Sequence, residues 1–341
     1  MKKETWSKIA HVARWLIVVA ICIVIFRSID WHRFVSVLTQ ANPWLILAGI
    51  LYYPLVILMG AVRWHTMLRA YHAERVHYAT SLKDYWSGLA IGVFAPASLG
   101  WDVYRVAVAT RRYGNVIANS ATIVVEKMMA LLTCASLVTL LVPFMGIAAD
   151  NRELQQIIQA TYIVLVGTLG VLVIAFLMAR HGAASVRFFQ SMSDRLIKQL
   201  DRLSQRKELS ASQKIPLVVT FAPLRRPDIL LRITIFSFLI QLTSAVGNQI
   251  FFIAVNYDLP FLVNLFVVPV LYFVFLLPIS FGSLGIREGA FILLFGAFGV
   301  PMETALVVSF LNLLSILSNN LVGGIILALD PNRPPHTQPT R

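Results

Sequence analysis

Apolar positions recur in long runs along the whole chain, and these runs have the length of membrane spans. A helix needs roughly 20 apolar residues to cross the hydrocarbon core of a bilayer, within a range of about 17–25. The runs are separated by shorter polar segments, the longest from about 180 to 227. The pattern predicts an all-α, polytopic membrane protein with about six spanning helices. The expected spans are residues 12–28, 43–62 (extending to 69), 118–144, 161–179, 231–256 and 303–329.

Two further apolar stretches do not fit a simple crossing. Residues 85–95 are too short to span before "PASLG" interrupts them, and residues 261–300 are long but broken by proline and glycine. Both contain the frame P-x-S-x-G-x-x-x-x-R, first in "FAPASLGWDVYR" and again in "LLPISFGSLGIR". Proline ends a helix by removing a donor, and glycine permits unusual dihedral angles. Each stretch therefore predicts a helix that stops inside the membrane and a second helix that returns. The expected structural breaks are Pro96, Pro278 and Gly285.

Charge gives these segments an orientation, because Lys and Arg accumulate in cytoplasmic loops. Residues 180–232 hold eleven basic and four acidic residues, a net charge of +7, whereas residues 145–160 carry a net charge of −1. The basic residues on either side of 85–112 agree with this orientation only if that stretch enters and leaves on the cytoplasmic side. By the same count, residues 261–300 dip in from the opposite side, although two full spans are an open alternative there.

The unit of span, re-entrant pair and span thus occurs twice, as repeat A at about 43–145 and repeat B at about 231–329. An odd number of crossings separates their starts, so the second copy is inverted relative to the first. Inverted repeats with broken helices are typical of transporters that bind their substrate near the bilayer midplane. Chance recurrence of the frame is the alternative. The chain is then a single membrane domain over 1–341, with both termini in the cytoplasm and a basic amphipathic linker at about 180–230.

Composition supports a membrane protein and excludes several other classes. The chain is 58% hydrophobic and only 13% charged, against about 25% charged in soluble domains. Its net charge of +13 fits basic cytoplasmic loops, so we expect no nucleic-acid partner. Cys22 and Cys134 both lie in apolar runs, which supports neither a disulfide framework nor a metal site. No Walker loop, H-E-x-x-H or G-x-S-x-G occurs, so we expect no catalytic residues and no cofactor.

The repeated motif carries candidate anion-binding chemistry. A return helix that starts inside the membrane presents free N–H groups and a positive dipole end to an anion. Arg105 and Arg287 lie in the first turns of the two return helices, where a guanidinium can contact a phosphate, although an interfacial arginine is the alternative for Arg105. Asp102 is expected to cap the first return helix. The candidate substrate-binding residues are Ser98, Gly100, Asp102, Arg105, Glu126, Lys127, Ser280, Gly282, Arg287 and Glu288.

Ionisable and amide side chains inside the spans add to this set. Glu126 and Lys127 lie about two turns into the third expected span, and intramembrane charges are costly and usually functional. A structural ion pair with Arg105 or Asp102 is the alternative for Glu126. Later spans carry amides that either line a polar path or join helices by hydrogen bonds. They are Gln241, Asn248, Gln249, Asn312, Asn319 and Asn320.

The segments "GVFAPASLGWDVYRV", "SATIVVEK" and "LLPISFGSLGIREGA" resemble the transmembrane region of lysylphosphatidylglycerol synthetases, a family that includes stand-alone flippase-like proteins. The resemblance covers about 10–329, and "PISFGSLGIREG" is its most specific part. Trp101 departs from the family, which usually has a second glycine there. The resemblance maps the family's arginines and acids onto Asp102, Arg105, Glu126, Arg287 and Glu288.

The resemblance implies movement of a lipid rather than its synthesis, because "DPNRPPHTQPTR" follows the last span where large members continue into an aminoacyl-transferase domain. The implied function is a flippase in the inner (cytoplasmic) membrane that carries an anionic lipid or polyisoprenoid-linked headgroup through a central polar cavity. Its partners would be phospholipids or a lipid-linked glycan. A membrane-embedded enzyme or enzyme subunit that modifies such a lipid is the alternative, and an oligomer or a lipid-modifying partner enzyme stays open.

Overall fold

The computed structural model describes residues 30–72, 75–93, 99–145, 155–156, 158–163, 165–170, 226–276 and 285–329. The regular elements in these ranges are all helices, and none is a strand. Four helical segments among them are long and apolar enough to cross a membrane: Pro43–His72, Val116–Phe144, Pro227–Ala254 and Met302–Leu329. They confirm an integral, multi-pass, all-α membrane protein and agree with four expected spans to within a few residues. The expected span at 12–28 lies outside the described residues, as do residues 171–179 of the span at 161–179.

The first described helix, α2 (Trp31–Gln40), was not expected from the sequence. Its start is fixed by Asp30, whose carboxylate accepts hydrogen bonds from the backbone N–H groups of the first turn. The first described span then consists of two helices, α3 (Pro43–Tyr52) and α4 (Pro54–His72). The interruption falls at Pro54, which has no N–H to donate to the preceding turn.

Two shorter helices follow and pack against each other as a hairpin: α5 (Tyr78–Gly92) and α6 (Leu99–Tyr113). Residues 94–98 between them lie outside the described residues. Helix α7 (Val116–Leu141) comes next and ends in a short 3₁₀ turn, Val142–Phe144. The motif "FAPASLGWDVYR" therefore lies where α5 gives way to α6, as the broken-helix expectation required.

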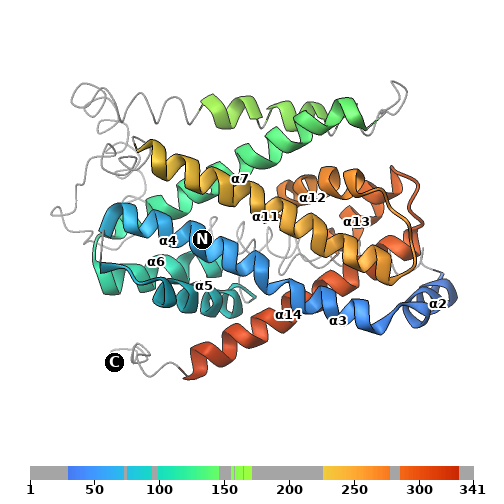
Figure 1. The fold of residues 1–341 in the computed structure, drawn as a ribbon, viewed down its shortest axis with the longest axis horizontal. Helices are drawn as coiled ribbons and strands as arrows, with labels where there is room; N and C mark the ends of the chain where they lie inside the picture. Colours follow the sequence, from blue (N-terminus) through green and yellow to red (C-terminus); the bar gives the residue numbers. More distant parts are fainter. Residues whose placement is uncertain are drawn as a thin grey trace, which may run out of the picture.

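The second half of the chain has the same order of elements. A long helix, α11 (Pro227–Ala254), precedes α12 (Phe261–Leu276), α13 (Ile286–Gly296) and the last helix, α14 (Met302–Leu329). Figure 1 shows the α5–α6 hairpin at the left end of the molecule and the α12–α13 pair at the right end. It also shows α3–α4 and α11 running side by side in opposite directions through the middle.

Each hairpin packs against the last helix of the other half. Helix α5 lies on α14, and α12 lies on α7, while α4 and α11 pack together between them. Small residues permit the closest approaches: a Cβ at Gly323 of α14 would lie 2.3 Å from the carbonyl oxygen of Trp86 on α5. These contacts interlock the two halves around a common centre.

Within the described residues the apolar core consists of three clusters. The largest is built mainly from α11 to α14 and includes Phe252 and Phe295. A second joins α4, α5 and α6 through Trp64, and a small third joins α4, α7 and α11 through Met67 and Ile233. Buried apolar surface of this kind holds helices together by close packing, because lipid offers no hydrophobic driving force between them.

Candidate functional site

A cavity of about 380 Å³ lies at the centre of the structure, between the two halves of the chain. Helices α3 to α7 and α11 to α14 all contribute to its wall. Much of the wall is aromatic or aliphatic, and the rest carries hydroxyl, amide and charged groups. The ionised side chains on the wall are Arg63, Glu126, Lys127 and Arg287. The cavity therefore brings together three of the expected site residues from both halves and adds Arg63.

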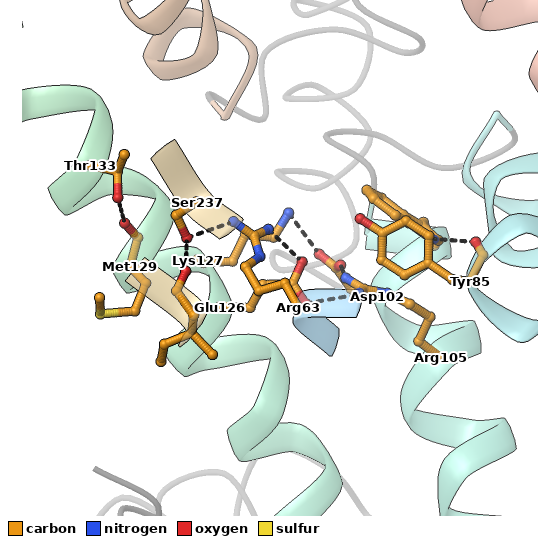
Figure 2. Close-up of polar contacts among 11 residues, drawn as sticks. Arg63, Tyr85, Asp102, Arg105, Glu126, Lys127, Met129, Thr133 and Ser237 are labelled. Atoms are coloured by element: carbon orange, nitrogen blue, oxygen red, sulfur yellow. Dashed lines mark hydrogen bonds and ion pairs between the residues drawn. The ribbon is translucent and has the colours of Figure 1, made fainter. Parts of the chain in front are cut away.

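Glu126 of α7 is the central acid of the site. Its Oε1 accepts a hydrogen bond from Nη2 of Arg63 at 3.0 Å, and its Oε2 accepts one from Nη1 of Arg105 at 2.9 Å (Figure 2). Arg63 also donates to Oγ of Ser237 on α11 at 3.1 Å. Glu126 is 3% exposed. One buried carboxylate thus binds two guanidinium groups from two other helices, which confirms that it takes part in structural ion pairs.

Asp102 extends this network on α6. Its Oδ1 binds Nη2 of Arg105 at 2.7 Å, and its Oδ2 lies 3.3 Å from Nζ of Lys127. The expectation that Asp102 caps the return helix was wrong, because α6 begins at Leu99 and Asp102 lies within its first turn. Asp102 and Arg105 are three positions apart on the helix, which is a spacing at which side chains on one face meet. The ion pairs thus form a chain in which the charges alternate in sign, in the order Arg63, Glu126, Arg105, Asp102 and Lys127.

Arg105 is fully buried and does not line the cavity. Its guanidinium carbon lies 5.4, 5.0 and 4.4 Å from the ring centres of Trp64, Tyr85 and Trp101. Of these three rings, Tyr85 and Trp101 line the cavity, and Trp101 is the nearer of the two to Arg105. Arg105 is held by two carboxylates and three aromatic faces, so in this conformation it supports Glu126 rather than meeting a ligand directly.

Arg287 of α13 has very different surroundings. It is 7% exposed, it lines the cavity, and its Nη1 is buried without a hydrogen-bond partner among the described residues. Within those same residues no carboxylate forms an ion pair with it. Its neighbour Glu288 instead accepts a hydrogen bond from the backbone N–H of Gly285 at 2.6 Å and thereby caps the helix. Gly285 has φ +79°, as its expected role in breaking the chain direction requires.

The cavity wall has an excess of positive charge. Three cations, Arg63, Lys127 and Arg287, face it with one anion, Glu126, among the described lining residues. A buried charge is costly unless it is paired or hydrogen-bonded. The unpaired Nη1 of Arg287 and the net charge of +2 therefore favour an anionic group in this space.

The amide side chains have both of the roles that the sequence left open. Gln241, Asn248 and Asn312 line the cavity, and Asn312 of α14 also donates to Asn248 of α11 at 2.6 Å. Asn248 in turn donates to Asn264 of α12, a residue that sequence analysis did not single out. The side chain of Asn319 donates to the backbone carbonyl of Ser315 on its own helix, and only the backbone carbonyl of Asn319 accepts from the indole of Trp86 on α5.

The remaining expected residues take no direct part in the described site. Gly100 lies in the first turn of α6. No group of three or more metal-ligating side chains occurs within the described parts of the chain. Five expected positions fall outside the described residues: Pro96, Ser98, Pro278, Ser280 and Gly282.

Comparison with family models matches residues 11–317 to the transmembrane region of lysylphosphatidylglycerol synthase. The match covers most of the chain, so the protein belongs to this family. No curated protein matches it. Membership links this multi-pass membrane protein to lipid biology and confirms the resemblance seen in the two motif copies.

Proposed function

We propose that this member of the lysylphosphatidylglycerol synthase transmembrane family is a lipid flippase. It would move an anionic lipid, either a phospholipid or a polyisoprenoid-linked glycan, between leaflets of the inner membrane. The observation that carries the proposal is Arg287, a buried guanidinium without an acidic partner among the described residues, on the wall of a cavity with excess positive charge. A phosphate group would supply the missing counter-charge.

The arrangement of the two halves supports a transport mechanism. The α5–α6 and α12–α13 pairs lie at opposite ends of the molecule, and each packs on the last helix of the other half. We propose that both pairs are re-entrant, that the halves are inverted repeats, and that both termini are cytoplasmic. Non-helical backbone at membrane depth is tolerated only where protein or a wet cavity covers it, and the central cavity would meet that need.

The cavity has the right size for a headgroup. Small-molecule sites usually enclose about 300–1,000 Å³, and this one, at about 380 Å³, lies near the lower limit. It would hold a phosphate and a small polar group while the hydrocarbon chains stay in the bilayer. Arg287, Lys127 and Arg63 would contact the phosphate, and the amides of Asn248 and Asn312 would bind hydroxyl groups.

The test is lipid transfer by purified protein in liposomes that contain labelled anionic lipid. The fraction of label accessible to a membrane-impermeant quencher measures transfer. Arg287→Gln removes a charge-assisted contact of about 1.5–3 kcal/mol, so transfer at limiting lipid should fall roughly 10–150-fold. Arg287→Lys keeps the charge but loses the planar guanidinium, so its transfer should lie between that of the wild type and that of Arg287→Gln. Arg33→Gln, at a side chain 76% exposed on α2, is the matched control.

Normal transfer by Arg287→Gln would refute the proposal that Arg287 binds the headgroup during transfer. A chemically modified lipid formed by purified protein without any leaflet transfer would replace the flippase by a membrane-embedded enzyme. Both results come from one preparation, since lipids extracted after the transfer assay reveal any product.

A further inference from the structure

A second, separate pocket of about 330 Å³ lies between the end of α4 and the start of α11. It shares no residue with the central cavity. Next to it, Met67, Ile229 and Ile233 belong to one packed apolar cluster of α4, α7 and α11. The pocket is lined by His65, Thr66, Arg69, Ala70, Arg226, Asp228, Ile229 and Arg232.

Helix length places this pocket at the depth of lipid headgroups. The spans Pro43–His72 and Pro227–Ala254 contain 30 and 28 residues. At 1.5 Å per residue they are about 45 and 42 Å long, close to the thickness of a bilayer with its headgroup regions, about 40–45 Å. The last turns of α4 and the first turns of α11 therefore reach the polar surface of the membrane, not its hydrocarbon core.

The pocket is strongly basic. Among the described lining residues, three arginines, at positions 69, 226 and 232, face a single carboxylate, that of Asp228. Arg226 and Asp228 form an exposed ion pair at 3.1 Å, the kind that solvent and salt weaken. Arg69 and Arg232 have no ion pair within the described residues, and they come from two different helices. Two free guanidinium groups across one hollow are suited to the oxygens of a single phosphate.

We propose that this pocket binds the phosphate of an anionic phospholipid in the leaflet at this end of the molecule. The apolar side chains of Ala70 and Ile229 at the wall would contact the glycerol end of the lipid. A zwitterionic lipid also has a phosphate, but its cationic group would meet the same arginines. The pocket would therefore select net negative charge. It is independent of transport, because none of its residues reaches the central cavity.

The test measures lipid retained by the purified protein in nanodiscs of phosphatidylcholine that contain a minority of phosphatidylglycerol. Each arginine near an anionic headgroup contributes about fivefold in affinity, so Arg69→Gln with Arg232→Gln should lose roughly 30-fold. Arg111→Gln, an exposed residue at the end of α6 and outside the pocket, is the matched control and should keep wild-type binding. Inorganic phosphate in solution is a separate arm and should not displace the lipid.

Three results would overturn the proposal. The double variant could retain as much phosphatidylglycerol as the wild type, or the wild type could retain phosphatidylcholine as well as it retains phosphatidylglycerol. The third is displacement of the lipid by inorganic phosphate at low concentration. The last would assign the pocket to a free anion. Leaflet transfer is measured on the same variants. If the two sites are separate, the double variant should lose lipid retention but keep normal leaflet transfer. Arg287→Gln should keep normal lipid retention.

Discussion

Glu126→Gln is the sharpest perturbation of the buried charge network. The carboxylate is 3% exposed and accepts hydrogen bonds from Arg63 and Arg105 at 3.0 and 2.9 Å. Glutamine has nearly the same shape, but it has one acceptor oxygen and presents an NH₂ group to the second guanidinium. The variant therefore removes the charge that balances two arginines without creating a cavity.

The size of the effect follows from the partners that each arginine keeps. Arg105 keeps the carboxylate of Asp102, whereas Arg63 keeps no carboxylate among the described residues and has only neutral acceptors such as the hydroxyl of Ser237. Removing one partner of a buried ion pair costs about 3–5 kcal/mol, because the other charge stays buried without compensation. In a chain of this length a change of 1 kcal/mol shifts the melting temperature by about 2 °C. The expected decrease is therefore about 6–10 °C.

Thermal unfolding of the purified protein in detergent measures this shift. Asp228→Asn is the control, because it removes the exposed Arg226–Asp228 pair and should leave the melting temperature unchanged. Combining Glu126→Gln with Arg63→Met removes the stranded charge and should recover part of the loss. A melting temperature for Glu126→Gln within about 1 °C of wild type would refute the argument that this carboxylate balances two buried charges.

Two further predictions concern packing and topology. Gly323→Ala should destabilise the protein by about 1–3 kcal/mol, because its Cβ would lie 2.3 Å from the backbone oxygen of Trp86. Gly324→Ala is the control in the same unfolding assay and should be neutral, because its Cβ would lie 3.8 Å from the nearest side chain. Single cysteines are placed at Arg111 and at Asp258 in a background without Cys22 and Cys134. The two cysteines should react with impermeant reagents on opposite sides of the membrane. Reaction of both cysteines on the same side would exclude the inverted arrangement.

The spans were predictable because the bilayer fixes their length. Four expected spans match helices of the structure, and α13 begins directly after Gly285, one of the expected structural breaks. Helix α2 was missed because it is a short amphipathic helix of ten residues, five of them apolar, and therefore contains no apolar run of span length. Its signal was nevertheless present: Asp30 stands directly before the helix and caps it, a start signal that can be recognised in sequence.

Asp102 shows why a local signal can fail. A cap residue fixes a helix start only if the residues before it leave the helix, and here Leu99 to Trp101 continue it. Trp101 packs against α5, where a Cβ at Gly88 would lie 2.5 Å from its ring. That contact between two helices favours one more helical turn than the sequence suggests. Asp102 is thereby freed to bind Arg105 and Lys127.

Arg63 was missed for another reason. Along the chain it is one of several basic residues near the end of a span, which is the usual sign of a cytoplasmic loop. Only the packing of α4 on α7 and α11 brings it to Glu126 and Ser237. Its role depends on partners 63 and 174 residues away in sequence, and no local pattern carries that information.

The two copies of the motif differ in charge balance. In the first copy, Asp102 lies three residues before the arginine and Glu126 follows on the next helix, so Arg105 is doubly paired. In the second copy, the residue three before Arg287 is Leu284, and α14 has a single acid, Glu303, in its first turn. The same frame therefore gives one arginine that fixes the position of a carboxylate and one that is left without an acid among the described residues. An anion brought into the cavity would complete the second pair, which is why we propose that Arg287 makes the direct ligand contact.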